Sequence, residues 1–150
     1  MAAATPFIWP VRVYWEDTDA GGIVFYANYL KFFERARTEW LRSLGLGQQA
    51  LRERTGGMFV VTDTHLQYRS PARLDDLLHI SATVTELGRA SITLKQEARM
   101  YDAGCAENAR GTLLCEGTIR IGWVLEDSLK PQRLPPDIAL ALQPQVPPHT

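Results

Sequence analysis

Cysteine, long apolar runs and net charge are all scarce in this chain of 150 residues. The two cysteines, Cys105 and Cys115, are ten positions apart and form neither a Cys-x-x-Cys redox pair nor a zinc-ligand spacing. No run of about 18 apolar residues exists, which excludes an ordinary transmembrane helix. A formal net charge of -1 gives no general attraction to nucleic acid or to an anionic membrane. We therefore expect reduced cysteines, no nucleic-acid partner and no transmembrane segment.

The sequence also lacks the signals of export and of serine catalysis. Residues 1–6 contain neither the positive nor the apolar region of a signal peptide, so we expect a cytoplasmic protein. No Gly-x-Ser-x-Gly motif is present, which argues against a serine hydrolase. His65 and His79 fall in expected strands without a repeated ligand spacing, and we expect no bound metal.

The first half of the chain contains one long stretch of helical periodicity. Length and composition, with 45% hydrophobic and 22% charged residues, predict a single domain over residues 1–150. A short strand is expected at residues 11–15. Helical spacing from Val24 to Leu44, ended by Gly45 and Gly47, predicts a long helix. Its expected buried face comprises Tyr26, Tyr29, Leu30, Phe33, Ala36, Trp40 and Leu44.

Alternating apolar and polar residues dominate the second half. After a brief helix at residues 48–54, the period of two predicts strands near residues 58–68, 78–85, 90–100 and 113–123. Short turns between the last strands indicate antiparallel pairing. Prolines gather from about residue 130, so we expect a surface tail with one helical turn at residues 137–142. This order of elements predicts an α+β fold whose sheet curls around the helix.

The most informative local pattern is an acidic glycine turn, residues 17–22, which leads into the long helix. Helix starts present unpaired backbone N–H groups and the positive end of the helix dipole. A carboxylate held there can attack a carbonyl or activate water, while the N–H groups stabilise an oxyanion formed during acyl transfer. The same residue types also suit an ordinary turn and helix cap, so the pattern alone leaves a structural role open.

Four segments in matching order resemble the hotdog-fold acyl-CoA thioesterases of the 4-hydroxybenzoyl-CoA thioesterase type. They are Asp17-Thr18-Asp19-Ala20-Gly21-Gly22, Phe25-Tyr26-Ala27-Asn28-Tyr29, Phe33-Glu34-Arg35-Ala36-Arg37 and Tyr68-Arg69-Ser70-Pro71-Ala72-Arg73-Leu74-Asp75-Asp76. The resemblance covers roughly residues 9–135 and is greatest to the thioesterases associated with the bacterial Tol-Pal system.

That resemblance implies both a fold and an activity. The fold is a five-stranded antiparallel sheet wrapped around a long central helix. The activity is hydrolysis of an acyl-CoA to free acid and coenzyme A, without a cofactor, because coenzyme A is part of the substrate. A homodimer or homotetramer with its active site at the subunit interface is also implied.

The resemblance further assigns roles to individual positions. Asp19 matches the family's catalytic carboxylate, and Asp17 is the second candidate. The backbone N–H of Tyr26 matches the group that polarises the thioester carbonyl. Glu34 lies near the depth at which aromatic-specific relatives place an acid against the substrate, although an ion pair with Arg37 is the favoured role here.

Arg89 and Ser91 lie where a turn enters an expected strand, a region in which related enzymes hold the coenzyme A phosphates. A solvated turn arginine is the alternative. The residues leave open whether Asp19 acts as nucleophile or general base, which acyl group is bound, and whether the donor is coenzyme A or acyl carrier protein. Two rival functions are a non-catalytic module that binds acyl-CoA or acyl carrier protein, and a dehydratase, which the lack of histidine at the turn disfavours.

Overall fold

The computed structural model describes residues 6–101 and 111–145. Five strands form one antiparallel sheet in the order β1-β3-β4-β5-β2. The strands are β1 (Phe7–Arg12), β2 (Gly57–Tyr68), β3 (Leu77–Leu87), β4 (Ser91–Met100) and β5 (Leu113–Leu125). The helices are α1 (Asn28–Ser43), α2 (Gln48–Thr55) and α3 (Pro136–Leu142), with 3-10 turns at Trp15–Asp17 and Gln143–Gln145. The expected α+β class and five-stranded antiparallel sheet are confirmed.

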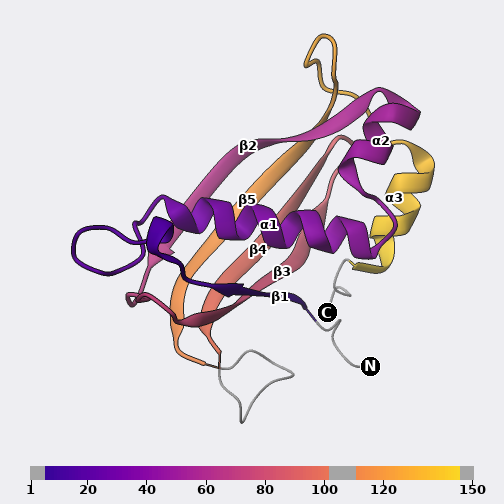
Figure 1. Cartoon of the computed structure of the whole chain (residues 1–150). Coiled ribbons are helices and arrows are strands. Elements are labelled where there is room, and N and C mark those ends of the chain that lie inside the picture. Colours follow the sequence, from indigo (N-terminus) through magenta and orange to yellow (C-terminus); the bar gives the residue numbers. More distant parts are fainter. Residues whose placement is uncertain (1–5, 102–110, 146–150) are drawn as a thin grey trace.

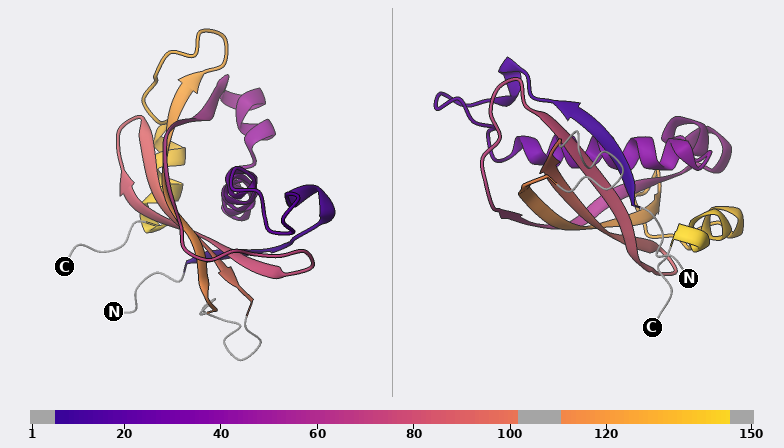
Figure 2. Two further views of the ribbon diagram at one scale, coloured as in Figure 1. Left: turned by 90° about the vertical axis from the view of Figure 1, so that its left-hand side faces the viewer. Right: turned by 90° about the horizontal axis from the view of Figure 1, so that it is seen from below.

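The sheet curves around α1, which lies along its concave face (Figures 1 and 2). Alternation along each strand explains this packing, because every second side chain points toward the helix. Those inward side chains are buried and include Leu78, Ile80, Ala82 and Val84 of β3 and Ile92, Leu94, Gln96 and Ala98 of β4. The core therefore lies between α1 and the sheet.

The long helix starts later than the periodicity predicts. It begins at Asn28 instead of Val24, because Val24 donates its N–H to the Ala72 C=O (2.9 Å) and Ile23 forms a bridge with Arg73. These pairings with a distant segment hold residues 23–24 extended. The predicted end is confirmed, since α1 stops at Ser43 and is followed by Gly45, whose φ of +78° suits glycine.

The buried face of α1 is also rotated from the expected one. Four predicted positions are buried, namely Tyr29, Phe33, Ala36 and Trp40. Two predicted positions, Tyr26 and Leu30, are exposed, whereas Phe32 and Leu41 are buried in their place. The later start of the helix accounts for Tyr26, which precedes α1 and does not share its period.

The first strand and the C-terminal segment differ from the sequence-based expectation. The strand lies at residues 7–12 instead of 11–15 and contains Pro10, which an edge strand tolerates because one row of its N–H groups needs no partner. The segment after residue 130 is not a surface tail. Leu134, Ile138 and Leu142 are buried, and α3 packs at the end of the sheet near α2 (Figures 1 and 2).

Two further expectations concern the cysteines and the membrane. Cys115 is buried and free, as expected, whereas Cys105 lies outside the described residues. Within the described ranges, no helix has both the length and the apolar character needed to cross a membrane.

Candidate active site

A tight turn holds Asp19 between β1 and α1. The Gly22 N–H donates to the Asp19 C=O (3.0 Å), and the Asp19 N–H donates to the Ile23 C=O (2.9 Å). The carboxylate closes the same turn, because its Oδ1 accepts from the N–H groups of Gly21 (2.8 Å) and Ile23 (3.4 Å). Gly22 has φ +79°, a left-handed conformation that favours glycine. The acidic glycine pattern is therefore what places the Asp19 carboxylate.

The two acids of the turn have different surroundings. Asp17 is 5% exposed, and its Oδ2 accepts from the Tyr14 N–H (2.8 Å). The Asp17 C=O also accepts from the Phe25 N–H (2.9 Å) and from Asn28 Nδ2 (2.8 Å). Asp19 is exposed in the single chain, its Oδ2 accepts no hydrogen bond from the described residues, and it lines none of the pockets described below. Asp17 thus serves the structure of the turn, and Asp19 keeps a free carboxylate oxygen.

Tyr26 lies in the turn that leads into α1. Its N–H and that of Ala27 donate to no acceptor in the described part of the chain. Nearby, the Asn28 N–H donates to the Phe25 C=O (2.8 Å), which closes the turn. Unpaired N–H groups before a helix are the usual donors for an anionic oxygen. The site predicted at Tyr26 therefore has the free donors that it needs, in a turn instead of a helix.

A pocket of about 280 Å³ opens beside this turn, and we call it the tyrosine pocket. The buried Tyr29 forms part of its wall, and burial raises the pKa of this phenol to about 12. The Tyr68 ring lies between two others, with its centre 6.1 Å from that of Tyr26 and 5.8 Å from that of Tyr29. The lining residues are Ile23, Val24, Tyr26, Tyr29, Tyr68, Arg69, Ser70 and Pro71.

A second pocket, of about 150 Å³, lies between α1 and β2 and contains Glu34. Glu34 is exposed and accepts a hydrogen bond from the Thr38 hydroxyl (3.1 Å). The predicted Glu34–Arg37 ion pair does not form among the described residues. Arg37 is instead on the buried side of α1, and its Nη1 donates to Gln96 Oε1 (2.9 Å). The lining residues are Glu34, Arg37, Thr38, Leu41, Gln48, Phe59, Val61 and Ile121.

Comparison with known proteins identifies the family. Residues 21–106 match the model of the thioesterase superfamily. The chain belongs to this superfamily. It is 44% identical over 135 residues to the acyl-CoA thioester hydrolase YbgC of Escherichia coli O157:H7, a match that covers 89% of this chain and 93% of the relative. The acyl-CoA thioesterase YbgC of Haemophilus influenzae is 42% identical and is covered to 93% by a match over 90% of this chain.

Solved structures agree with that membership. A probable thioesterase from Bartonella henselae has a TM-score of 0.75 and 30% sequence identity, with 87% of this chain and 99% of that chain covered. A thioesterase superfamily protein from Jannaschia sp. CCS1 has a TM-score of 0.83 at 21% identity, which supports the fold alone. The hotdog resemblance and the assignment of this chain as a thioesterase are thereby confirmed.

The two residues predicted to hold coenzyme A, Arg89 and Ser91, lie at the opposite end of the molecule from Asp19. Arg12, near the Asp19 turn, pairs with Leu77 at the start of β3, whereas Arg89 and Ser91 follow the end of that strand. Eleven strand residues separate the two ends by roughly 30 Å. Arg89 is exposed and its C=O accepts from the Leu134 N–H (2.8 Å), near α3. One copy of the chain therefore does not bring these residues to Asp19.

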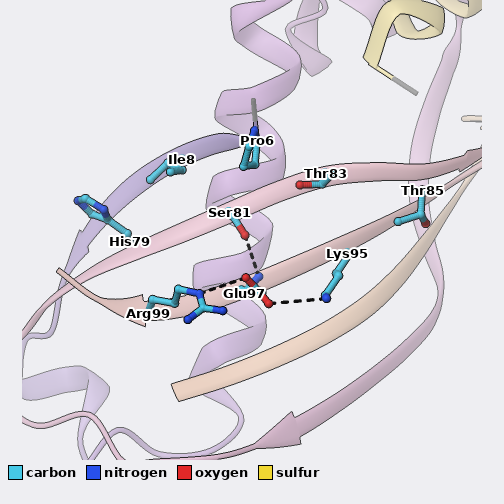
Figure 3. A pocket seen from close by; sticks show the side chains of 9 residues that line it. All are labelled: Pro6, Ile8, His79, Ser81, Thr83, Thr85, Lys95, Glu97 and Arg99. Carbon is cyan, nitrogen blue, oxygen red and sulfur yellow. Dashed lines mark hydrogen bonds and ion pairs between the residues drawn. The ribbon is translucent and has the colours of Figure 1, made fainter. Parts of the chain in front are cut away.

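A further pocket, of about 240 Å³, lies on the outer face of the sheet, away from α1 (Figure 3). Glu97 sits between two cations, 3.7 Å from Lys95 Nζ and 3.2 Å from Arg99 Nε. His79 is buried, which lowers the pKa of its imidazole, and its Nδ1 has no partner among the described residues. The charges there are mutually paired, and the pocket is separated by the sheet from the Tyr26 turn. It does not fit the proposed thioester chemistry.

Two residues near the candidate thioesterase site were not predicted from the sequence. Gln96 is fully buried opposite α1, and the only sequence signal was a missing apolar residue in the inward series of β4. The Tyr68 hydroxyl donates to the Tyr26 C=O (3.1 Å), a contact between positions 42 residues apart. Strand alternation contains no signal for such a contact, because it depends on how the turn folds back onto the sheet.

Proposed function

We propose that the protein hydrolyses the thioester of an acyl-CoA to a free acid and coenzyme A. The proposal rests on one observation. Asp19 has a free Oδ2 on a turn that is followed, within a few residues, by the unpaired N–H groups of Tyr26 and Ala27. A carboxylate and nearby peptide donors are the two components that thioester hydrolysis needs without a metal or a serine. The relatives named as acyl-CoA thioesterases support coenzyme A as the thiol carrier.

Two routes are open to the Asp19 carboxylate. As a nucleophile, it forms a bond to the thioester carbon, the C–S bond breaks, and the thiolate leaves and takes a proton from water. Water then hydrolyses the mixed anhydride, releases the acid and restores Asp19. As a general base, it accepts a proton from water as that water attacks the same carbon, and the proton passes to the leaving sulfur. In both routes the N–H of Tyr26 donates to the carbonyl oxygen as it gains negative charge.

The complete site requires two copies of the chain in this proposal. Arg89 and Ser91 are too far from Asp19 within one copy to bind the phosphates of the same substrate. The edge strand β2 is exposed on both faces over residues 61–65, so a second copy can cover it. We propose a homodimer or homotetramer in which Arg89 and Ser91 of one copy serve Asp19 of another.

The acyl group is proposed to enter the pocket that contains Glu34. That pocket lies farther along α1 from Tyr26, and its walls at Phe59, Val61 and Ile121 are apolar. Glu34 is the proposed polar contact to the acyl group. Acyl carrier protein is a second possible thiol donor, which the same assay distinguishes.

The decisive experiment measures thiol release by the purified protein from acetyl-, hexanoyl-, benzoyl- and palmitoyl-CoA, and from the matching acyl carrier proteins. Asp19→Asn keeps the size of the side chain and should lower kcat by at least about 100-fold. Asp127→Asn, at an exposed turn position, is the matched control and should keep parental activity. Binding of acyl-CoA without release by the parent would replace the enzyme with a binding module. Near-parental turnover by folded Asp19→Asn protein would remove Asp19 from the mechanism.

A further inference from the structure

We infer that the Tyr68 hydroxyl positions the peptide donors that precede α1, a role that rests on the thioesterase mechanism proposed above. Tyr68 is the last residue of β2 and donates to the Tyr26 C=O (3.1 Å). That bond fixes the turn of Tyr26 and Ala27 to the end of the sheet. Tyr68 is therefore a positioning residue for the oxyanion donors and not itself a catalytic residue.

The carbonyl that Tyr68 binds is one that the helix leaves available. In a regular helix the Leu30 N–H would donate to the Tyr26 C=O, but here it donates to the Ala27 C=O (3.1 Å). The Tyr26 C=O belongs to the same peptide unit as the Ala27 N–H. Because a hydrogen bond to a carbonyl polarises its peptide, the phenol both orients this unit and strengthens the donor at its other end.

The Tyr68 ring is itself held by its neighbours. It packs at 59° against Tyr29, which is 3% exposed and belongs to the first turn of α1. It also meets the Tyr26 ring edge-on, at 89°. Contacts with two aromatic rings restrict where the hydroxyl can lie. The hydroxyl can therefore fix the position of the Tyr26 carbonyl relative to the end of β2.

The phenol keeps its proton through the pH range in which a thioesterase is assayed. Burial raises the pKa of Tyr68 above its ordinary value of 10.0, and the neighbouring Cys115 thiol acts in the same direction. The hydroxyl thus stays a donor and cannot act as a base for water. This agrees with a role in orientation.

The hydrogen bond contributes more to geometry than to folding. Tyr68 is 48% exposed, and hydrogen bonds exchanged with water add little net stability. A displacement of the donors by less than 1 Å, in contrast, weakens the stabilisation of the transition state strongly. Removal of this hydroxyl should therefore be visible in turnover before it is visible in unfolding.

The test compares Tyr68→Phe with Tyr101→Phe, a half-exposed tyrosine at the end of β4 that packs against His79. Tyr68→Phe should lower kcat about tenfold with KM within twofold, because the lost interaction is made in the transition state. Tyr101→Phe should match the parent. Affinity for an S-alkyl coenzyme A thioether, which has no carbonyl oxygen, should be the same in Tyr68→Phe and the parent.

Each other result overturns the inference in an identifiable way. Parental kcat in Tyr68→Phe, with Asp19→Asn inactive, would reject the role of Tyr68 and leave the proposed function intact. A loss of thioether affinity equal to the loss of kcat/KM would assign Tyr68 to general substrate binding. If only Tyr68→Leu loses activity, the ring and not the hydroxyl matters. Absence of thiol release by the parent with every substrate would overturn both proposals.

Discussion

Replacement of Gln96 by leucine should destabilise this thioesterase more than any exposed polar substitution. Gln96 belongs to β4 and is fully buried against α1, and its amide forms hydrogen bonds with three partners. Its Nε2 donates to the C=O groups of Phe33 (3.0 Å) and Ser81 (3.3 Å), while its Oε1 accepts from Arg37 Nη1 (2.9 Å). Both carbonyls only accept, so the amide orientation is fixed, and the oxygen must face Arg37.

The magnitude follows from what Gln96→Leu leaves behind. The buried Phe33 C=O and the half-buried Ser81 C=O each lose a donor, and a buried polar group that loses its partner costs about 1–3 kcal/mol. The guanidinium of Arg37, which is 8% exposed, loses its acceptor, and burial already lowers its pKa. We expect a total loss of about 3–5 kcal/mol in the free energy of unfolding. Leucine fills a similar volume, so the packing contribution is small.

Urea denaturation at a fixed protomer concentration measures this loss. Gln132→Leu, at an exposed position, is the matched control and should change stability by less than about 0.5 kcal/mol. The double variant Gln96→Leu/Arg37→Met removes both the amide and the charge, and should recover about 2 kcal/mol of the loss. A loss below about 1 kcal/mol for Gln96→Leu, or a double variant no more stable than the single one, would refute the reasoning.

Two further predictions concern assembly and pH. Arg89→Ala should raise KM for acyl-CoA about tenfold with little change in kcat, because a charge-assisted contact to phosphate is lost. Assayed as kcat/KM, at substrate concentrations below KM, a refolded equimolar mixture of Arg89→Ala and Asp19→Asn should regain about a quarter of the parental activity if each site uses two copies. No recovery would place both residues in one chain's site. Burial lowers the pKa of His79 below its ordinary 6.5. The contribution of its neutral imidazole to the free energy of unfolding should therefore be complete above pH 6.5 and be lost as the pH falls through the folded-state pKa. The free energy of unfolding, measured at pH values from 8 to 5, should lose part of this slope in His79→Phe, and an unchanged slope would contradict the assignment.

Strand alternation predicted the sheet well because it reports burial on one face. In β3, for example, Leu78 and Ile80 point toward α1, whereas His79 and Ser81 line the outer pocket. Elements fixed by contacts between distant segments were predicted less well. The start of α1 depends on the pairing of Val24 with Ala72, and nothing in residues 20–30 alone indicates that pairing. The helical turn expected at residues 137–142 is present as α3, but the proline content gave no indication that its Ile138 and Leu142 are completely buried.

In the candidate site, too, local features could be predicted from the sequence, whereas features that depend on distant contacts could not. The Asx-type turn of Asp19 could be predicted, since it uses residues within four positions of each other. The separation of Asp19 from Arg89 could not, because it depends on the direction in which β3 runs from one end of the molecule to the other. The buried Arg37 was likewise assigned to the wrong partner, because its acceptor is 59 residues away.

The two acids of the turn show how one carbonyl can set the geometry of the proposed reaction. The Asp17 C=O accepts from both the Phe25 N–H and Asn28 Nδ2, so it ties the turn to the start of α1 at two points. Asp19 follows this hub by two residues, and the Tyr26 N–H follows Phe25 by one. The Asp17 carbonyl therefore holds the segment of Asp19 against the turn that carries the proposed oxyanion donors. The Asp17 side chain adds a third tie, because its buried Oδ2 accepts from the Tyr14 N–H (2.8 Å), so in the proposed reaction Asp17 has a structural role and the exposed Asp19 the chemical one.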